Sequence, residues 1–176
     1  MKTMKQLMAS FEIDDKLYKK NFKTKEFNKI FYEIPHEDNY NLMADLLFLP
    51  KTPDDYKYLL VITDIYNSKF DIEPIKNKES KTVLDALLKI FKRKYINMPK
   101  ASISTDAGSE FKSVFNDYLN KNEIFHKISS TSRHTQQANV ESLNRILGKI
   151  IMIYLSKKSR ETDTVFTDWT KILPQI

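Results

Sequence analysis

The stretch at residues 132–151, SRHTQQANVESLNRILGKII, constrains the fold most, because it predicts a long helix with two unlike faces. Apolar residues recur there with the spacing of one helix face, at Val140, Leu143, Leu147, Ile150, Ile151 and Tyr154. The opposite side carries Glu141, Arg145, Gly148 and Lys149. A carboxylate followed by cations suits a surface that handles phosphates better than a plain solvated face. The question is then which groups Glu141 meets.

The rest of the chain predicts a mixed sheet. Runs of strand length and composition occupy 40–49, 58–65, 69–75, 101–105 and 125–128. Helical periodicity marks 80–95, 112–120, 138–157 and 164–173, with Ser80 as the expected N-cap of the first of these helices. Short turns between the first three strands predict an antiparallel meander, whereas strands separated by helices predict parallel crossovers. The expected fold is α/β, a mixed five-stranded sheet flanked by helices.

Composition limits the class of protein. With 176 residues the chain is long enough for one ordinary domain. A net charge of +6 is compatible with a polyanionic partner without establishing one, although residues 142–160 carry five cations and no acid. No cysteine is present, which excludes disulfides and zinc sites built on cysteine. No apolar run reaches the roughly 18 residues of a membrane span, so no membrane partner is expected and an intracellular place fits.

Three acids stand out by position. Asp45 lies inside an apolar run, where a carboxylate needs a partner, a metal ion or an exposed strand face. Asp106 follows a strand and precedes a turn at Gly108, so it suits a ligand or a helix cap equally well. Glu141 taken alone suits a solvated helix acid. If the first and fourth strands are neighbours and the long helix crosses their ends, the three carboxylates converge, and cations must then offset their repulsion.

A convergent set of carboxylates favours Mg²⁺ or Mn²⁺, because these ions prefer oxygen ligands. Two such ions about 3.5–4 Å apart can hold both the attacking and the leaving oxygen of an in-line phosphoryl transfer. This chemistry needs no covalent intermediate with the protein.

Three stretches resemble motifs of retrovirus-type integrases. TDAGSEF at 105–111 resembles that family's D-N-G-x-E-F segment, with Ala107 where asparagine is usual, and HTQQANVESLNR at 134–145 resembles P-Q-x-Q-G-x-V-E-x-x-N-[KR]. Asp106 and Glu141 are 35 residues apart, the interval of the D,D-35-E signature. ITDIYNSKF at 62–70 is similar to the family's V-D-x-x-S-R-F strand pair. His134 and Ala138 replace the usual proline and glycine, so the conformation of this loop can differ from the family's.

The resemblance implies an RNase H-like fold and a DNA integrase. Asp45, Asp106 and Glu141 would hold two Mg²⁺ or Mn²⁺ ions for 3′-end processing and strand transfer of double-stranded DNA. The residues expected to bind DNA are Arg133, His134, Gln137, Asn144, Arg145 and Lys149, the last of them on helical geometry alone. The alternatives are an RNase H-like nuclease and a catalytically silent DNA-binding or assembly module.

The resemblance also implies an organisation. Residues 1–32 are expected to form a lysine-rich lead-in or linker, and residues 33–176 the integrase catalytic core of a longer protein from the Maverick/Polinton or virophage branch. A homodimer or higher oligomer is expected, in the virion, the host nucleus or the cytoplasm. A second apolar row on the long helix suits either a core or a dimer interface: Ile146, Ile150 and Ile153. Asp64 is expected to have a turn role, Glu110 a structural one, and His126 to be a surface or satisfied strand-edge residue.

Overall fold

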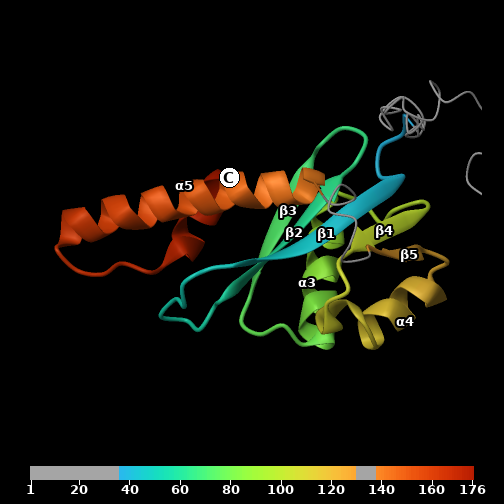
Figure 1. Cartoon of the computed structure of the whole chain (residues 1–176), viewed down its shortest axis with the longest axis horizontal. Helices are drawn as coiled ribbons and strands as arrows, with labels where there is room; N and C mark the ends of the chain where they lie inside the picture. Colours follow the sequence, from blue (N-terminus) through green and yellow to red (C-terminus); the bar gives the residue numbers. More distant parts are fainter. Residues whose placement is uncertain (1–35, 130–137) are drawn as a thin grey trace, which may run out of the picture. The chain divides into compact units, whose positions relative to one another are not determined.

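The computed structural model describes residues 36–129 and 138–176, all within one compact unit that spans 34–176. Figure 1 shows its strands, β1 (Asn41–Phe48), β2 (Tyr58–Asp64), β3 (Phe70–Ile75), β4 (Ser102–Thr105) and β5 (Phe125–Ile128). The helices are α3 (Ser80–Arg93), α4 (Val114–Lys121) and α5 (Ala138–Thr162), with 3₁₀ turns η2 (Ser109–Phe111) and η4 (Trp169–Gln175). The predicted lead-in at 1–32 lies outside the described residues, so the predicted division at residue 33 stays a prediction.

The five strands form one sheet in the order β3-β2-β1-β4-β5. β1, β2 and β3 pair antiparallel, as short turns require, while β4 runs parallel to both β1 and β5. The predicted mixed five-stranded sheet is confirmed. β1 lies at its centre, so the first and fourth strands are neighbours.

Helices cover both faces of the sheet (Figure 1). Successive side chains of β1 alternate between the faces. Leu42, Ala44 and Leu46 belong to the core that α3 and α4 close. Met43 belongs to the second core, which joins β2 to the buried face of α5 and to Trp169. Asp45 shares the pleat side of Met43 and therefore lies on the α5 face.

Several element boundaries differ from the prediction. Ser80 is the first residue of α3 but caps nothing in it, because its hydroxyl instead accepts the Phe115 N–H at 3.1 Å and donates to the Lys112 carbonyl. α3 ends at Arg93 because Lys94 adopts a left-handed conformation, with φ of 61°. α5 continues past the predicted end to Thr162, and Lys158 and Glu161 pair there at 2.7 Å.

The predicted final helix at 164–173 is instead the 3₁₀ turn η4. It is anchored by Trp169, whose Nε1 donates to the Pro50 carbonyl at 2.7 Å. Within the described residues, no helix has both the length and the apolar character needed to cross a membrane.

Candidate catalytic site

Asp45 and Asp106 come from neighbouring strands. The parallel pairing of β1 with β4 sets Leu42 opposite Ile103 and Met43 opposite Ser104. The same register continued by two residues brings Asp45 beside Asp106, which directly follows β4. Asp45 is partly buried and Asp106 is exposed. The sheet order thus brings together two carboxylates that are far apart in the sequence.

Glu141 reaches the same region from α5. It lies exposed in the first turn of this helix, which packs against β1 and β2. The pKa of Asp45 is raised to about 6, chiefly by burial; the negative charges of Asp106 and Glu141 also raise it, and the hydrogen bonds from Leu46 and Asn144 lower it. Both acids are therefore close enough for their charges to act on Asp45.

Asn144 links α5 to Asp45. Its Nδ2 donates to Asp45 Oδ2 at 2.8 Å, while the Leu46 N–H donates to Asp45 Oδ1 at 2.8 Å. Asn144 is only 8% exposed, and its Oδ1 is buried without a hydrogen-bond partner in the described part of the chain. The amide is thus engaged inside the protein, where it orients Asp45, and the predicted DNA contact of Asn144 stays a prediction.

The loop after β4 is tight around Gly108. Asp106 Oδ1 accepts the Gly108 N–H at 3.0 Å, and a Cβ on Gly108 would lie 2.9 Å from this oxygen and 2.7 Å from Glu110 Cδ. The φ of Gly108 is −56°, which any residue can adopt. A larger residue here would therefore displace the carboxylate groups of Asp106 and Glu110, so the position is limited by space and not by the conformational freedom that the sequence suggested. Glu110 is buried beside it, which fits the predicted structural role.

A series of hydrogen bonds connects the Asp106 backbone to β5 and α4. Thr105, fully buried, donates from Oγ1 to the Asp106 carbonyl at 2.8 Å, and the same Oγ1 lies 2.9 Å from His126 Nε2. His126 Nδ1 in turn lies 2.9 Å from Asn116 Oδ1, and burial lowers the pKa of the imidazole. His126 is thus a satisfied strand-edge residue, as expected. Its link to the Asp106 loop could not be foreseen, because it depends on the pairing of β4 with β5.

The remaining predicted residues divide into two groups. Arg145 and Lys149 lie exposed on α5, whereas Arg133, His134 and Gln137 lie outside the described residues. Asp64 has the expected turn role, since its carboxylate accepts the N–H groups of Asn39 at 2.7 Å and Tyr66 at 2.9 Å.

The three acids do not form one closed metal cage. Across 36–129 and 138–176, no three His, Cys, Asp or Glu side chains are close enough together to hold a metal ion. The chemistry of the site still fits a hard divalent cation. All three predicted ligands are carboxylates, two of them act electrostatically on the third, and an amide oxygen is left without a partner beside Asp45.

Comparison with known proteins identifies one family. The integrase core domain family matches residues 35–134. A putative uncharacterized transposon-derived protein of Caenorhabditis elegans is 32% identical over 109 residues, which cover 61% of this chain and 37% of that protein. The chain thus spans well under half the length of this relative.

Solved integrase structures share the fold. The chain superposes on the simian T-cell lymphotropic virus intasome in complex with PP2A regulatory subunit B56 gamma with a TM-score of 0.60 and 22% identity, over 68% of this chain and 42% of that chain. It matches the HTLV-2 integrase catalytic core domain in complex with magnesium with a TM-score of 0.55 and 22% identity. This match covers 77% of this chain and 83% of the HTLV-2 chain. For the catalytic core domain of BIV integrase the TM-score is 0.53 with 15% identity. This match covers 68% of this chain and 73% of the BIV chain.

These structures share the mixed sheet and flanking helices of the RNase H-like fold. The family match covers more than half of the chain, from before β1 to beyond β5. The chain therefore belongs to the integrase core domain family.

Proposed function

We propose that this chain is the catalytic core of a DNA integrase, in which Asp45, Asp106 and Glu141 hold two Mg²⁺ or Mn²⁺ ions for 3′-end processing and strand transfer. The observation that carries the proposal is the neighbouring position of β1 and β4. It places Asp45 beside Asp106, and the charge of Glu141 acts on the same carboxylate. The magnesium bound by the HTLV-2 catalytic core supports the choice of cation.

The bound ions would neutralise the acids and activate water or a DNA 3′-OH for in-line attack on phosphorus. The residues of the chain prepare the site for them. Asp45, with a pKa of about 6, is mostly ionised at neutral pH and so available as a ligand. Asn144 fixes one of its oxygens, and the Gly108 N–H fixes one oxygen of Asp106. A cation between the acids would also relieve their repulsion.

Double-stranded DNA is the proposed substrate. Arg145 and Lys149 follow Glu141 on α5 and would bind phosphates near the reacting bond. Arg133, His134 and Gln137, which precede α5 in the sequence, are also proposed contacts. Binding through such cations should weaken steeply with salt, since each neutralised phosphate releases counterions. Salt-insensitive binding would contradict this part of the proposal.

The active form is proposed to be a homodimer or larger assembly of a longer protein. Dimeric and trimeric forms of the HTLV-2 core and the simian virus intasome support an oligomer. The limited share of the transposon-derived relative that the chain covers supports further segments in the whole protein. Membership of the Maverick/Polinton or virophage branch, and a place in the virion, host nucleus or cytoplasm, stay predictions.

A joining assay tests the function. Labelled duplexes that mimic element ends are incubated with the full-length protein and Mn²⁺, and joined products longer than the input are expected. Cleavage of RNA–DNA hybrids without joining would indicate an RNase H-like nuclease, and neither activity would indicate a silent module.

The matched variant is Asp106→Asn, which we expect to abolish joining without unfolding the protein. Asp54→Asn, in the exposed turn after β1, should keep wild-type joining and serves as the control. Wild-type joining by Asp106→Asn would show that the catalytic assignment is wrong.

A further inference from the structure

A row of cations runs along α5 from the candidate catalytic site. Arg145 and Lys149 follow Glu141 at intervals of four residues, and Ser156 and Arg160 continue the row seven and eleven residues after Lys149. These intervals keep all five side chains on one side of a helix. All five are exposed. The row therefore begins at the proposed metal ligand and continues to the far end of the helix.

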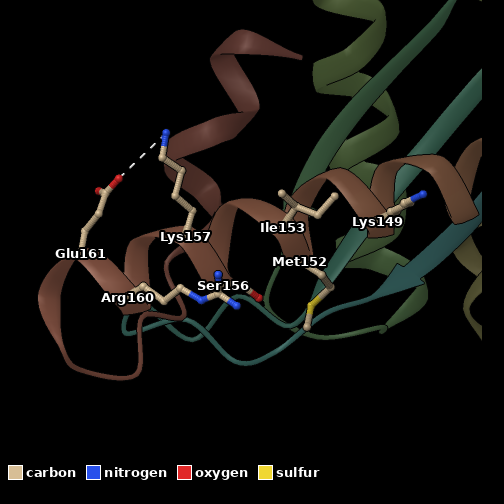
Figure 2. A pocket seen from close by; sticks show the side chains of 7 residues that line it. All are labelled: Lys149, Met152, Ile153, Ser156, Lys157, Arg160 and Glu161. Carbon is tan, nitrogen blue, oxygen red and sulfur yellow. Dashed lines mark ion pairs between the residues drawn. The ribbon is translucent and has the colours of Figure 1, made fainter.

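Figure 2 shows the far part of this row. Lys149, Met152, Ser156 and Arg160 line a shallow pocket on α5 together with Ile153, Lys157 and Glu161. The carboxylate of Glu161 already forms ion pairs, with Lys158 at 2.7 Å and with Lys157 at 4.0 Å. In the described part of the chain, no carboxylate oxygen lies within 4.0 Å of the side-chain nitrogens of Arg145, Lys149 or Arg160. The row thus keeps its positive charge.

The charge of this face indicates the kind of partner. Residues 142–160 carry five cations and no acid. Three of them, Arg145, Lys149 and Arg160, lie on the row, so a second copy docked through the same face would bring three cations against three, which is unfavourable. A polyanion would instead neutralise them and release counterions. The neighbouring row on α5 consists of the exposed apolar residues Ile146, Ile150 and Ile153. By helix spacing these residues lie beside the cations and not between them.

We propose that duplex DNA lies along the full length of α5, with phosphates far from the reacting bond bound by Ser156 and Arg160. The proposal rests on DNA being the substrate of the site. Glu141 and Arg160 are 19 residues apart, which on a helix corresponds to roughly 28 Å. At 3.4 Å per base pair, Arg160 meets a phosphate about eight base pairs from the reacting end.

Duplex length supplies the test. Binding is measured by fluorescence anisotropy over a range of salt concentrations in EDTA, with duplexes that extend about six or about sixteen base pairs from the mimicked end, below and above the expected reach. We expect the slope of log K against log salt for the wild type to be steeper on the long duplex by roughly 0.9 for each added phosphate contact. Arg160→Gln should lower this difference by about one contact.

Lys158→Gln is the matched control. It removes the same charge from the same helix, but Lys158 pairs with Glu161 and lies off the row. It should keep the wild-type difference between the two duplexes. Ser156→Glu is a second variant, which places a repelling charge in the row. It should weaken binding of the long duplex more than that of the short one.

Equal slopes for Arg160→Gln and the wild type on the long duplex would overturn the proposal, as would wild-type binding that does not depend on length. The face would then be free for an acidic protein partner. The joining assay separates this inference from the proposed function. Length-dependent binding without metal-dependent joining would count against the catalytic function alone. Joining by a protein whose binding does not depend on duplex length would count only against the proposal that DNA lies along α5.

Discussion

At the scale of single residues, the site depends on how each carboxylate is held. Asp45 receives hydrogen bonds from Asn144 and Leu46, and Asp106 from Gly108. Such contacts would hold each carboxylate in place for the proposed binding of a cation. Gly108 is a sensitive position, because a Cβ there would force the carboxylate groups of Asp106 and Glu110 to shift.

We expect Gly108→Ala to disturb the site. The added Cβ would lie 2.7 Å from Glu110 Cδ and 2.9 Å from Asp106 Oδ1, and the buried Glu110 has little space in which to move. Overpacking of this kind typically costs about 1–3 kcal/mol of stability. A displacement of about 1 Å in a catalytic group can reduce the rate roughly a hundredfold. Joining assays and denaturant titrations check both effects, and wild-type values in both would show that the loop tolerates the methyl group.

At the scale of elements, α5 combines a core function with a site function. Val140, Leu147, Ile151 and Leu155 bury one side against β1 and β2, while the other side carries Glu141 and the cations. The helix therefore positions Glu141 through packing on the side away from the proposed catalytic site. Gly148 lies between the two sides, half-buried and without a side chain to add to this packing.

We expect Gly148→Ala to stabilise α5. Alanine is favoured over glycine in a helix interior by about 1 kcal/mol, and the new Cβ would meet Leu47 Cδ1 at an ordinary contact distance of 3.8 Å. For a protein of this size, 1 kcal/mol raises Tm by roughly 2–4 °C. Differential scanning calorimetry measures the shift. An unchanged or lower Tm would mean that the β1–α5 contact cannot accept a methyl group.

At the scale of the whole molecule, the acidic site reduces the stability of the metal-free protein. The pKa of Asp45 is raised from 3.8 to about 6 in the folded state, so folding favours its protonated form. The stability that this proton provides is fully present below pH 3.8 and is lost as the pH rises through 6. The loss amounts to at most roughly 3 kcal/mol.

We therefore expect Asp45→Asn to be more stable than the wild type in EDTA at pH 8, and the difference in the free energy of unfolding to shrink towards pH 4. Asparagine stays neutral at both pH values and keeps an oxygen for Asn144. Urea titrations at several pH values measure the difference, with Asp54→Asn as the control. A difference that does not vary with pH would show that Asp45 is not perturbed by burial and neighbouring charge.

The local pattern of the sequence was sufficient to predict most elements. Strand 125–128 and the first residue of α5 agree with the structure, and the other strands differ by one or two residues at their ends. The exceptions are Ser80 and the last helix, where contacts with distant residues replaced local preference, and α5, which continues to Thr162 with ion pairs inside its last turns. Trp169, for example, is held by the Pro50 carbonyl.

The sequence by itself determined the order of strands and helices, the three acids and the interval of 35 residues between Asp106 and Glu141, because these follow from periodicity and spacing. Only the tertiary structure decided that Asp45 lies beside Asp106, that Asn144 holds Asp45, and that His126 supports the Asp106 loop. Each of these contacts joins residues far apart in the chain. Their geometry depends on strand register and on the packing of α5 across the sheet, which no local pattern encodes.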